Sequence, residues 1–404
     1  MGDNKILMIP GPTEIPLRVI RAMMRASEAH YDPHFNVGIL DETLEDLKKV
    51  FQTRNEVVAF PGSGRVALEA SILSAIEEGD EVLCIEGGIF GTWMSEMVNR
   101  AGGKATPFPL EWGKPIDYDK LESVISNGNF KALTIVHNET TTGTMYPLEK
   151  ISELAREYEL LLFVDTVSSM GGADIKTDEL GIDFNMTASH KCIAAPIGLS
   201  IVSVSERGWE AMENRKKPAF SFSFDLLKWK TWWIPKERGG TLIHGWRRQP
   251  TTMPVHLVYA LREAVKIILE EGLQKRFERH RIVSKAVREA VRAIGLQVLA
   301  EEEVASPTIT GVLTPEGIND AELRDRMVRK HGIMLSGGLG KMRGKMVRIG
   351  HMGVTAAPQY VIPTINALEA TLEEMGHKFE RGVGVATALE NLERLISAGP
   401  ISPL

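Results

Sequence analysis

Short apolar segments that alternate with amphipathic ones are the feature of this sequence that most restricts its fold. Between residues 56 and 205, apolar runs of strand length are separated by glycine turns and by segments with helical periodicity. Strands that alternate with helices form βαβ units, which build a parallel sheet covered on both faces. The sequence therefore predicts an α/β fold. The expected strands are 56–60, 81–86, 131–137, 160–165 and 199–205, and the expected helices are 66–78 and 151–158.

The pattern changes after residue 254. Long amphipathic stretches at 255–271 and 277–294 predict two consecutive helices. The shorter elements expected beyond them are 311–313, 321–330, 346–349, 359–375 and 385–398. A chain of 404 residues is longer than a typical single core, so two domains are expected. They are a large domain with a mostly parallel sheet (19–254), preceded by an N-terminal arm (1–18), and a smaller α+β C-terminal domain (255–404).

Composition and charge argue against several classes of protein. The net charge is −6, and no block of like charges occurs, so a nucleic-acid partner is not expected. No apolar run approaches the ~18 residues of a membrane span, and the N-terminus is too polar for a signal peptide. The two cysteines, Cys84 and Cys192, fit a reducing compartment, although a single disulfide stays possible. We therefore expect a cytoplasmic protein, and we assign no residues to a metal.

Asp165 and Lys191 are the residues that most directly suggest a chemistry. Asp165 ends the apolar strand LLLFVD, and ligands of open parallel sheets gather beyond the carboxyl ends of the strands. Lys191 follows in the segment SHKC. A pyridoxal-phosphate (PLP) enzyme needs a carboxylate for the pyridine nitrogen and a lysine for the Schiff base. Taken singly, Asp165 could be a helix or turn cap and Lys191 an ordinary surface lysine.

Three further elements each follow a predicted strand. The turn PGSGR, with Ser63, Gly64 and Arg65, opens a helix, and helix N-termini bind phosphate. Phe90 could stack on a flat ring or belong to the core. The polar cluster at 137–143 suits a ligand site or a capped loop. None of the three is specific by itself.

Arg348 lies within the apolar strand MVRIG, where a guanidinium is costly unless it is paired. A substrate carboxylate is one natural partner, because guanidinium binds carboxylate through two parallel hydrogen bonds. An internal acid is the other possible partner.

These elements, in this order, resemble class V aminotransferases, which are PLP-dependent transferases of fold type I. The likeness extends from Gly11 to Gly353 and is closest to the alanine–glyoxylate and serine–pyruvate aminotransferases. Its most specific parts are GSGR with ALEA, ETTTG, VDTVSS, SHKC and RIG. The resemblance implies a homodimer that moves an amino group from a small amino acid, such as alanine or serine, to glyoxylate or pyruvate.

The resemblance also implies roles for individual residues. Lys191 would carry PLP as a Schiff base and move the proton, Asp165 would hold the pyridine nitrogen, and Phe90 would stack on the ring. Thr252 would reach the phosphate across the dimer interface. The other implied cofactor contacts are Ser63, Gly64, Arg65, Thr140, Val167, His190 and Gln249. The implied substrate contacts are Arg348, Pro10, Gly11 and Tyr31.

The sequence departs from the family pattern at three of these positions. His190 stands where the alanine–glyoxylate group usually has glutamine, Gln249 where it often has tyrosine, and Phe90 where it often has tryptophan. The segments at 30–33 and 348–353 resemble pyridoxamine–pyruvate aminotransferase more. That relative accepts the free vitamin and has a glutamate in the phosphate cup, whereas Ser63 stands at the matching position here. The serine favours a bound phosphate cofactor.

Two rival functions follow from the same elements. Cysteine desulfurases share the His-Lys pair, but their chemistry needs a thiolate on a loop of the C-terminal part, and no cysteine follows Cys192. A PLP-binding protein without activity is the second rival. The presence of Lys191, Asp165 and Arg348 together argues against it.

Overall fold

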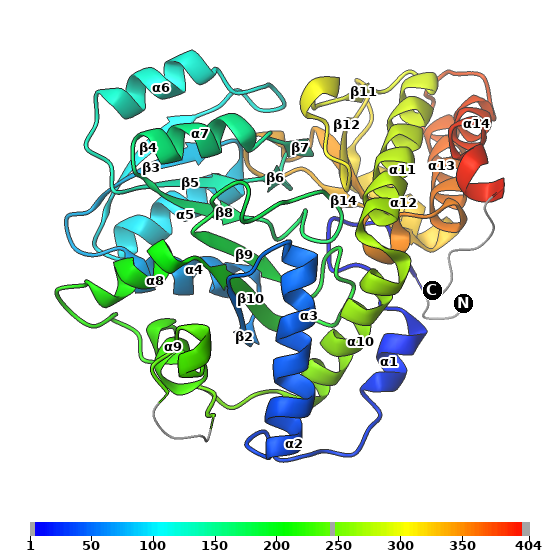
Figure 1. The fold of residues 1–404 in the computed structure, drawn as a ribbon. Coiled ribbons are helices and arrows are strands. Elements are labelled where there is room, and N and C mark those ends of the chain that lie inside the picture. The colour runs from blue at the N-terminus through cyan, green and yellow to red at the C-terminus, as the bar shows by residue number, and fades with distance from the viewer. Residues whose placement is uncertain (1–4, 243–246, 398–404) are drawn as a thin grey trace.

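A seven-stranded sheet forms the centre of the larger part of the molecule in the computed structural model, which describes residues 5–242 and 247–397 (Figure 1). All its strands run parallel except β10, which pairs antiparallel with both of its neighbours. Across the sheet the order is β2 (Glu56–Gly62), β10 (Gly198–Val204), β9 (Phe184–Ala188), β8 (Leu161–Asp165), β5 (Ala132–Val136), β3 (Glu81–Glu86) and β4 (Lys104–Pro109). The predicted α/β fold of type I is confirmed.

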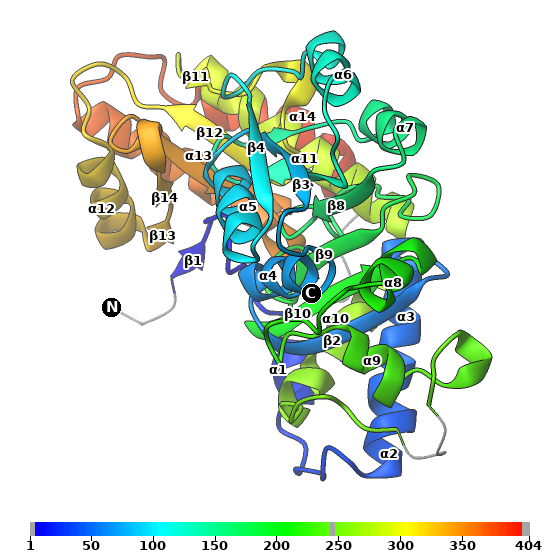
Figure 2. The ribbon, with the colours of Figure 1, turned by 90° about the vertical axis from the view of Figure 1, so that its left-hand side faces the viewer.

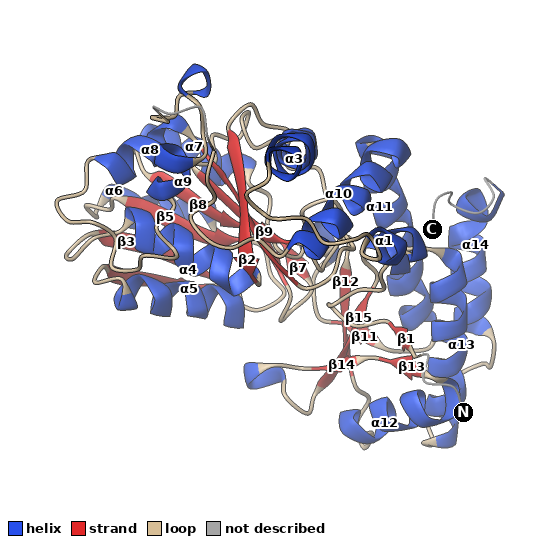
Figure 3. Ribbon diagram, turned by 90° about the horizontal axis from the view of Figure 1, so that it is seen from below, coloured by secondary structure: helices blue, strands red, loops and turns tan. Residues whose placement is uncertain are grey.

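The central strands are buried along their whole length. Every residue of β5, β8 and β9 is buried, as expected for strands covered by helices on both faces. Helices α4 (Gly64–Ala75) and α5 (Ile89–Arg100) cover one face, and α3 (Glu42–Phe51) and α7 (Glu149–Glu157) cover the other (Figure 3). Helices α6 (Tyr118–Ser126), α8 (Glu206–Glu213) and α9 (Leu227–Trp232) complete this part of the chain.

The antiparallel strand β10 places one loop at the carboxyl edge of the sheet. Because β10 returns beside β9, no crossover helix intervenes, and residues 189–197 form a loop directly beyond the end of β9. The ends of β5 and β8 lie level with it, since Val136 pairs with Asp165 and Asp165 with Met186. The edge thus brings Asp165 and Lys191 to one side of the sheet.

The C-terminal part contains a smaller antiparallel sheet and its helices. The strand order is β11 (Gln297–Val298), β12 (Ile309–Leu313), β15 (Met346–Gly350) and β14 (Ser336–Gly337). The helices packed around it are α11 (Leu273–Ala293), α12 (Asp320–His331), α13 (Pro358–Glu374) and α14 (Val383–Ser397). The tail helix was expected to reach Ala398, which lies outside the described residues.

The molecule has two main apolar cores, and the boundary between them lies where helix α10 (Val255–Glu271) meets helix α11. The first core surrounds the large sheet and includes α10 as far as Ile268, although the sequence analysis grouped this helix with residues 255–404. The second core contains residues of α11 from Val283 onward. The apolar periodicity of α10 shows that one face is buried, but periodicity does not specify which core receives that face.

The N-terminal segment links the two parts. Strand β1 (Ile6–Leu7) pairs in parallel with β13 (Ile333–Met334), and Figure 2 shows the two side by side. Met8 belongs to the second core. Thr13 donates its backbone N–H to His190 O (3.2 Å) and its hydroxyl to Met352 O (2.8 Å). The segment before α1 (Leu17–Ala22) therefore contacts the Lys191 loop and the small domain together.

Candidate active site

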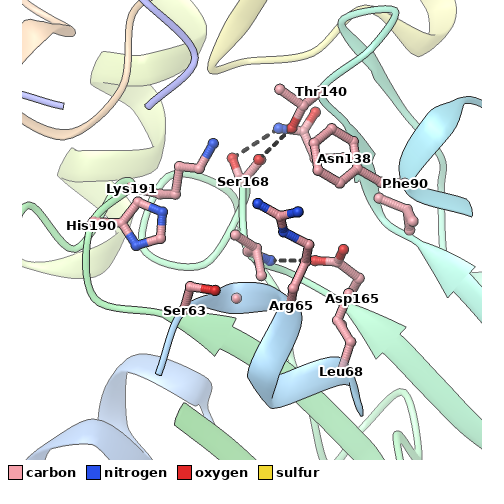
Figure 4. A pocket seen from close by; sticks show the side chains of 13 residues that line it. Ser63, Arg65, Leu68, Phe90, Asn138, Thr140, Asp165, Ser168, His190 and Lys191 are labelled. Atoms are coloured by element: carbon pink, nitrogen blue, oxygen red, sulfur yellow. Dashed lines mark hydrogen bonds between the residues drawn. The ribbon is translucent and has the colours of Figure 1, made fainter. Parts of the chain in front are cut away.

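The clearest cavity for a small ligand lies at the carboxyl edge of the large sheet (Figure 4). Its empty space is about 650 Å³, which includes the part that opens to solvent. Its walls include most of the residues that the sequence implied for the cofactor. They are Ser63, Gly64, Arg65, Phe90, Thr140, Asp165, Val167, His190 and Lys191. Leu68, Val136, Asn138 and Ser168 also line it.

Lys191 reaches the cavity from the loop between β9 and β10. Its amine donates a hydrogen bond to the backbone carbonyl of Pro10. Burial lowers the pKa of Lys191 to about 8, so about a tenth of the amine is uncharged at pH 7, far more than for an ordinary lysine. Gly11 (φ +108°) packs on this side chain, and a Cβ there would lie 2.5 Å from Lys191 Cδ. The structure therefore holds a nucleophilic amine, and the glycine leaves room for it.

Asp165 lies at the end of β8 on the opposite wall, and only 4% of it is exposed. One carboxylate oxygen accepts the backbone N–H of Val167 at 2.8 Å. Burial raises the pKa of Asp165 to about 7. Among the described residues this carboxylate forms no salt bridge, and attraction to the Lys191 amine only partly offsets the rise of its pKa. A buried acid without an ion-pair partner fits the protonated pyridine nitrogen of PLP, which would supply one.

The turn before α4 and the first residues of this helix form one end of the cavity. Ser63 is the N-cap of this helix, so Gly64 and Arg65 occupy its first turn. A Cβ at Gly64 would lie 2.7 Å from Val167, so glycine allows the turn to approach the Asp165 loop. The Arg65 guanidinium lies over the Trp93 ring at 5.0 Å. A helix N-terminus with an adjacent serine and arginine matches the needs of a phosphate.

The remaining wall combines an aromatic ring with hydroxyl groups. Phe90 lies in the first turn of α5 and packs edge to face on Trp93, with the ring centroids 4.9 Å apart. The Thr140 and Ser168 hydroxyls are 2.6 Å apart. Asn138 donates to Ser168 O (2.8 Å) and to the Thr308 hydroxyl (2.7 Å). Figure 4 shows Thr140, Asn138 and Ser168 grouped near Phe90.

Two buried polar atoms of the cavity walls have no hydrogen-bond partner within the part of the chain that the structure describes. They are Asn138 Oδ1 and His190 Nδ1. Burial lowers the pKa of His190 to about 4, so its ring is neutral near pH 7. Buried polar atoms are normally paired, so the two atoms indicate a polar ligand in the cavity. The residues present therefore fit PLP.

Arg348 lies just outside the cavity wall. Its Nη1 donates to Thr140 O (3.0 Å) and its Nε to Gly337 O (2.9 Å), and the residue is 7% exposed. Burial lowers its pKa to about 10. No carboxylate lies within salt-bridge distance of this guanidinium in the described ranges. The internal acid considered in the sequence analysis is therefore not seen as an ion-pair partner of Arg348.

Three of the implied site residues lie away from this cavity. Tyr31 is 57% exposed, and Thr252 is also exposed. Gln249 is buried and donates from Nε2 to His30 O (2.9 Å) and to the Asn36 side chain. In this chain its amide holds the 30–36 segment rather than a cavity group.

Sequence reasoning assigned no role to Ser168, Leu68 or Val136, and it included Asn138 only as part of the polar cluster at 137–143. The signal for Asn138 and Ser168 was present, because Asn138 directly follows the predicted strand 131–137 and Ser168 comes three residues after the strand 160–165. The part of the chain that the structure describes contains no cluster of side chains suited to a metal ion. None of its helices is both long and apolar enough to cross a membrane.

The fold and this cavity together define a PLP-dependent enzyme of fold type I. A model of the family described as aminotransferase class-V matches residues 6–355. An uncharacterized aminotransferase of Methanocaldococcus jannaschii is 37% identical over 95% of this chain and 97% of its own length. The (S)-ureidoglycine–glyoxylate transaminase of Bacillus subtilis is 34% identical over 96% of this chain and 95% of its own. The serine–glyoxylate aminotransferase of Methylorubrum extorquens is 34% identical over 95% and 94%.

Solved structures agree with these relatives. The ureidoglycine–glyoxylate aminotransferase of Bacillus subtilis superposes with a TM-score of 0.91 at 33% identity, covering 97% of this chain and 99% of that one. The pyridoxamine–pyruvate aminotransferase of Mesorhizobium loti gives 0.89 at 29% identity, covering 97% and 98%. The chain belongs to the class V aminotransferase family. It is a transaminase with PLP as its cofactor.

Proposed function

We propose that this enzyme transfers the amino group of a small amino acid, such as alanine or serine, to glyoxylate or pyruvate. The observation that carries the proposal is Arg348. Its buried guanidinium lies beside the cavity and hydrogen-bonds to carbonyl oxygens, so its charge is left for a substrate carboxylate. Relatives named serine–glyoxylate and alanine–glyoxylate aminotransferase support this substrate class.

The chain's own residues would then divide the work. When bound, PLP supplies an electron sink that makes the proton at the substrate α-carbon acidic. Lys191 Nζ, whose pKa of about 8 allows it to be neutral, takes that proton and returns it. Asp165, on the opposite wall of the cavity, would keep the pyridine nitrogen of PLP protonated. Arg348 orients the substrate carboxylate, which fixes the reacting carbon near Lys191.

Further residues would hold the phosphate and the ring. We assign the phosphate to Ser63, Gly64 and Arg65 at the N-terminus of α4, and the ring to Phe90 and Val167. Thr140 and His190 supply polar contacts at its edges. Pro10 and Gly11 line the entrance next to Lys191.

We also propose a cytoplasmic homodimer. Thr252 and Tyr31 are exposed and lie away from the cavity of their own chain. They are therefore free to contact the cavity of a second copy across a dimer interface. Gln249 joins this group through its bonds to the 30–36 segment. Sedimentation of the active enzyme tests the dimer, and a fully active monomer would overturn it.

The proposed substrates are tested by half-reactions with a panel of amino donors. Alanine and serine should convert the PLP spectrum to that of pyridoxamine phosphate, and glyoxylate or pyruvate should restore it. Failure of both donors, with turnover of a donor that carries a second charged group, would overturn the proposal. (S)-Ureidoglycine belongs in the panel, because the relative from Bacillus subtilis is named for it.

The second candidate is a pyridoxamine–pyruvate aminotransferase, favoured by the 0.89 TM-score to that enzyme. It predicts that free pyridoxamine is a substrate and that the purified protein retains no PLP. Ser63 and Arg65 at the helix N-terminus favour a retained phosphate instead. Mass spectrometry of the released cofactor, with a pyridoxamine–pyruvate assay, separates the two.

Cysteine desulfurase chemistry has no suitable thiol in this chain, because both cysteines are buried. Burial raises the pKa of Cys192 to about 11 and also raises the pKa of Cys84, so neither is a reactive thiolate at neutral pH.

A further inference from the structure

Behind the cavity, three charged side chains are buried at the junction of α10 and α11. Glu271 ends α10, and Arg276 and Arg279 lie in the first two turns of α11. Arg276 is 2% exposed and Arg279 is 3% exposed. Glu271 accepts from Arg276 Nη1 (2.6 Å) and from Arg279 Nε and Nη2 (2.6 and 2.9 Å). We call these residues the junction cluster.

The two arginines of the cluster reach backbone carbonyls of two different loops. Arg276 donates to Gly171 O (2.8 Å) and Cys192 O (2.6 Å), which follow Asp165 and Lys191 along the chain. Arg279 donates to Gly353 O (3.0 Å) and Ala356 O (2.6 Å), which follow β15 and Arg348. Glu271 therefore links the two arginines. Arg276 holds the Lys191 loop, and Arg279 holds the loop that follows the Arg348 strand.

The two loops also touch each other at Gly353. His280 accepts the backbone N–H of Gly353 at 3.0 Å, which fixes this glycine from α11. A Cβ at Gly353 would lie 3.2 Å from Cys192 O and 3.4 Å from Lys191 O. The loop after Arg348 is thus packed directly on the backbone of Lys191.

The Lys191 loop needs such support from its surroundings. Ala194 has a φ of +60°, in the left-handed region that non-glycine residues rarely occupy. Conformations of this kind persist only where neighbouring structure holds them. Two neighbours hold the loop in place. Arg276 donates a hydrogen bond to Cys192 O, and Gly353 packs so closely on Ala194 that a Cβ on this glycine would lie 3.2 Å from Ala194 Cβ.

We propose that Arg276 and Arg279, joined by Glu271, are positioning residues that set the Lys191 loop and the Arg348 strand at a fixed separation. The proposal rests on the roles given to Lys191 and Arg348 in the proposed function. The cluster touches neither cofactor nor substrate, and it acts through backbone carbonyls of both domains. Buried ion pairs often add little to stability compared with apolar side chains. Stability alone therefore does not explain why the two arginines hydrogen-bond to these two loops.

The test uses Arg276→Met and Arg279→Met, which keep an unbranched apolar stem and remove the charged guanidinium. Arg288→Met is the matched control, because Arg288 is a buried arginine on the same helix that pairs with Glu302 instead. Hydrogen exchange of the PLP-free protein is followed in peptides covering 189–195 and 350–356. Each cluster variant should accelerate exchange in both peptides, and the control should leave both at the parental rate.

With PLP bound, the cluster variants should retain cofactor and lose kcat/KM by roughly tenfold to a hundredfold, the scale expected for a misplacement of about 1 Å. Arg276→Lys, which keeps the charge but not the planar fork, should fall between the parent and Arg276→Met. If a methionine variant does not fold, the lysine variants carry the same exchange test.

Acceleration confined to the peptide that the mutated arginine contacts would overturn the proposal, because the two loops would then be held independently. Parental exchange in both peptides would overturn it as well. The exchange result does not depend on the substrate. Coupled exchange together with a failed donor panel would therefore sustain the positioning role and refute only the proposed function.

Discussion

The cavity and the junction cluster each bury a carboxylate, and they shift its pKa in opposite directions. Burial raises the pKa of Asp165 to about 7, because its described contact is a single backbone N–H. Burial also acts to raise the pKa of Glu271, but Arg279 and Arg276 outweigh it and lower that pKa. Desolvation is common to the two sites, and the difference is the counter-charge.

The difference shows which charges the chain satisfies by itself. Glu271 is matched inside the folded chain, so its site is complete. Asp165 and Arg348 are buried and Lys191 is half-buried, and the described residues place none of them in an ion pair. Unmatched buried charges are expensive for a structural site and are expected at a functional one. The following predictions test this comparison, from the largest expected effect to the smallest.

Replacing Lys191 should have the largest effect. Lys191→Ala should abolish transamination together with the borohydride-reducible chromophore, because no other amine replaces the Schiff-base lysine. Visible absorbance before and after borohydride, with an activity assay, measures both. Full activity in this variant would remove Lys191 from the site.

Removing the unmatched carboxylate should come next. Asp165→Ala deletes the charge that favours a protonated pyridine nitrogen, and each pKa unit of that preference is worth about 1.4 kcal/mol. A loss of two units would lower kcat by about a hundredfold, and PLP should still be detected by mass spectrometry. Unchanged turnover would mean that another group holds the nitrogen.

A smaller effect is expected at Arg348. Arg348→Lys keeps the charge but cannot form two parallel hydrogen bonds with a carboxylate. Charge-assisted hydrogen bonds contribute about 1.5–3 kcal/mol each, so kcat/KM should fall by about tenfold or more. KM for the amino acid and for the oxo acid should both rise, while PLP binding stays near normal. A lower Tm with unchanged KM values would instead identify Arg348 as a structural residue.

The smallest effect concerns stability and pH in the PLP-free protein. Because the folded state raises the pKa of Asp165 from 3.8 to about 7, it favours the protonated acid. The associated stability is present below the ordinary pKa and is lost as pH rises through about 7. Glu271, whose pKa is lowered, contributes stability above its ordinary pKa that is lost as pH falls through the lowered value.

Thermal unfolding from about pH 3 to pH 8 measures this contrast. Asp165→Asn should gain Tm relative to the parent as pH rises, by on the order of a few °C. Glu271→Gln should lose Tm relative to the parent near pH 7, and the deficit should shrink only below the ordinary pKa of 4.5. If both variants followed the parental curve, the two carboxylates would not differ as proposed.

Strong local patterns made the central fold predictable. Strand 81–86 matches β3 at both ends, because an unbroken apolar run lies between polar turns. Two strands of the large sheet were missed. In β9 (FNMTA), buried Asn185 and Thr187 break the apolar run, and their polar groups are satisfied by Thr177 and Thr166, which the sequence does not place nearby. β4 (KATPFP) lies at the edge of the sheet, where two prolines are tolerated.

The site was predictable where it depends on strand ends, and not where it depends on tertiary packing. Asp165, Thr140 and Ser63 each follow a recognisable strand, so their convergence follows from sheet topology. The junction cluster carries no such signal. Arg276 and Arg279 lie in LQKRFERHR, a charged stretch that reads as an exposed helix turn, and only the packing of α11 between two loops buries them.

The segment before α1 bears on how the chain is made. Strand β1 pairs with β13, and Thr13 holds Met352 as well as His190. This segment leaves the ribosome long before its partners, since a chain emerges and folds from its N-terminal side. It must therefore wait for residues beyond 330 before it can settle beside Lys191. Until those residues have emerged, the nascent large domain would carry an unfinished cavity.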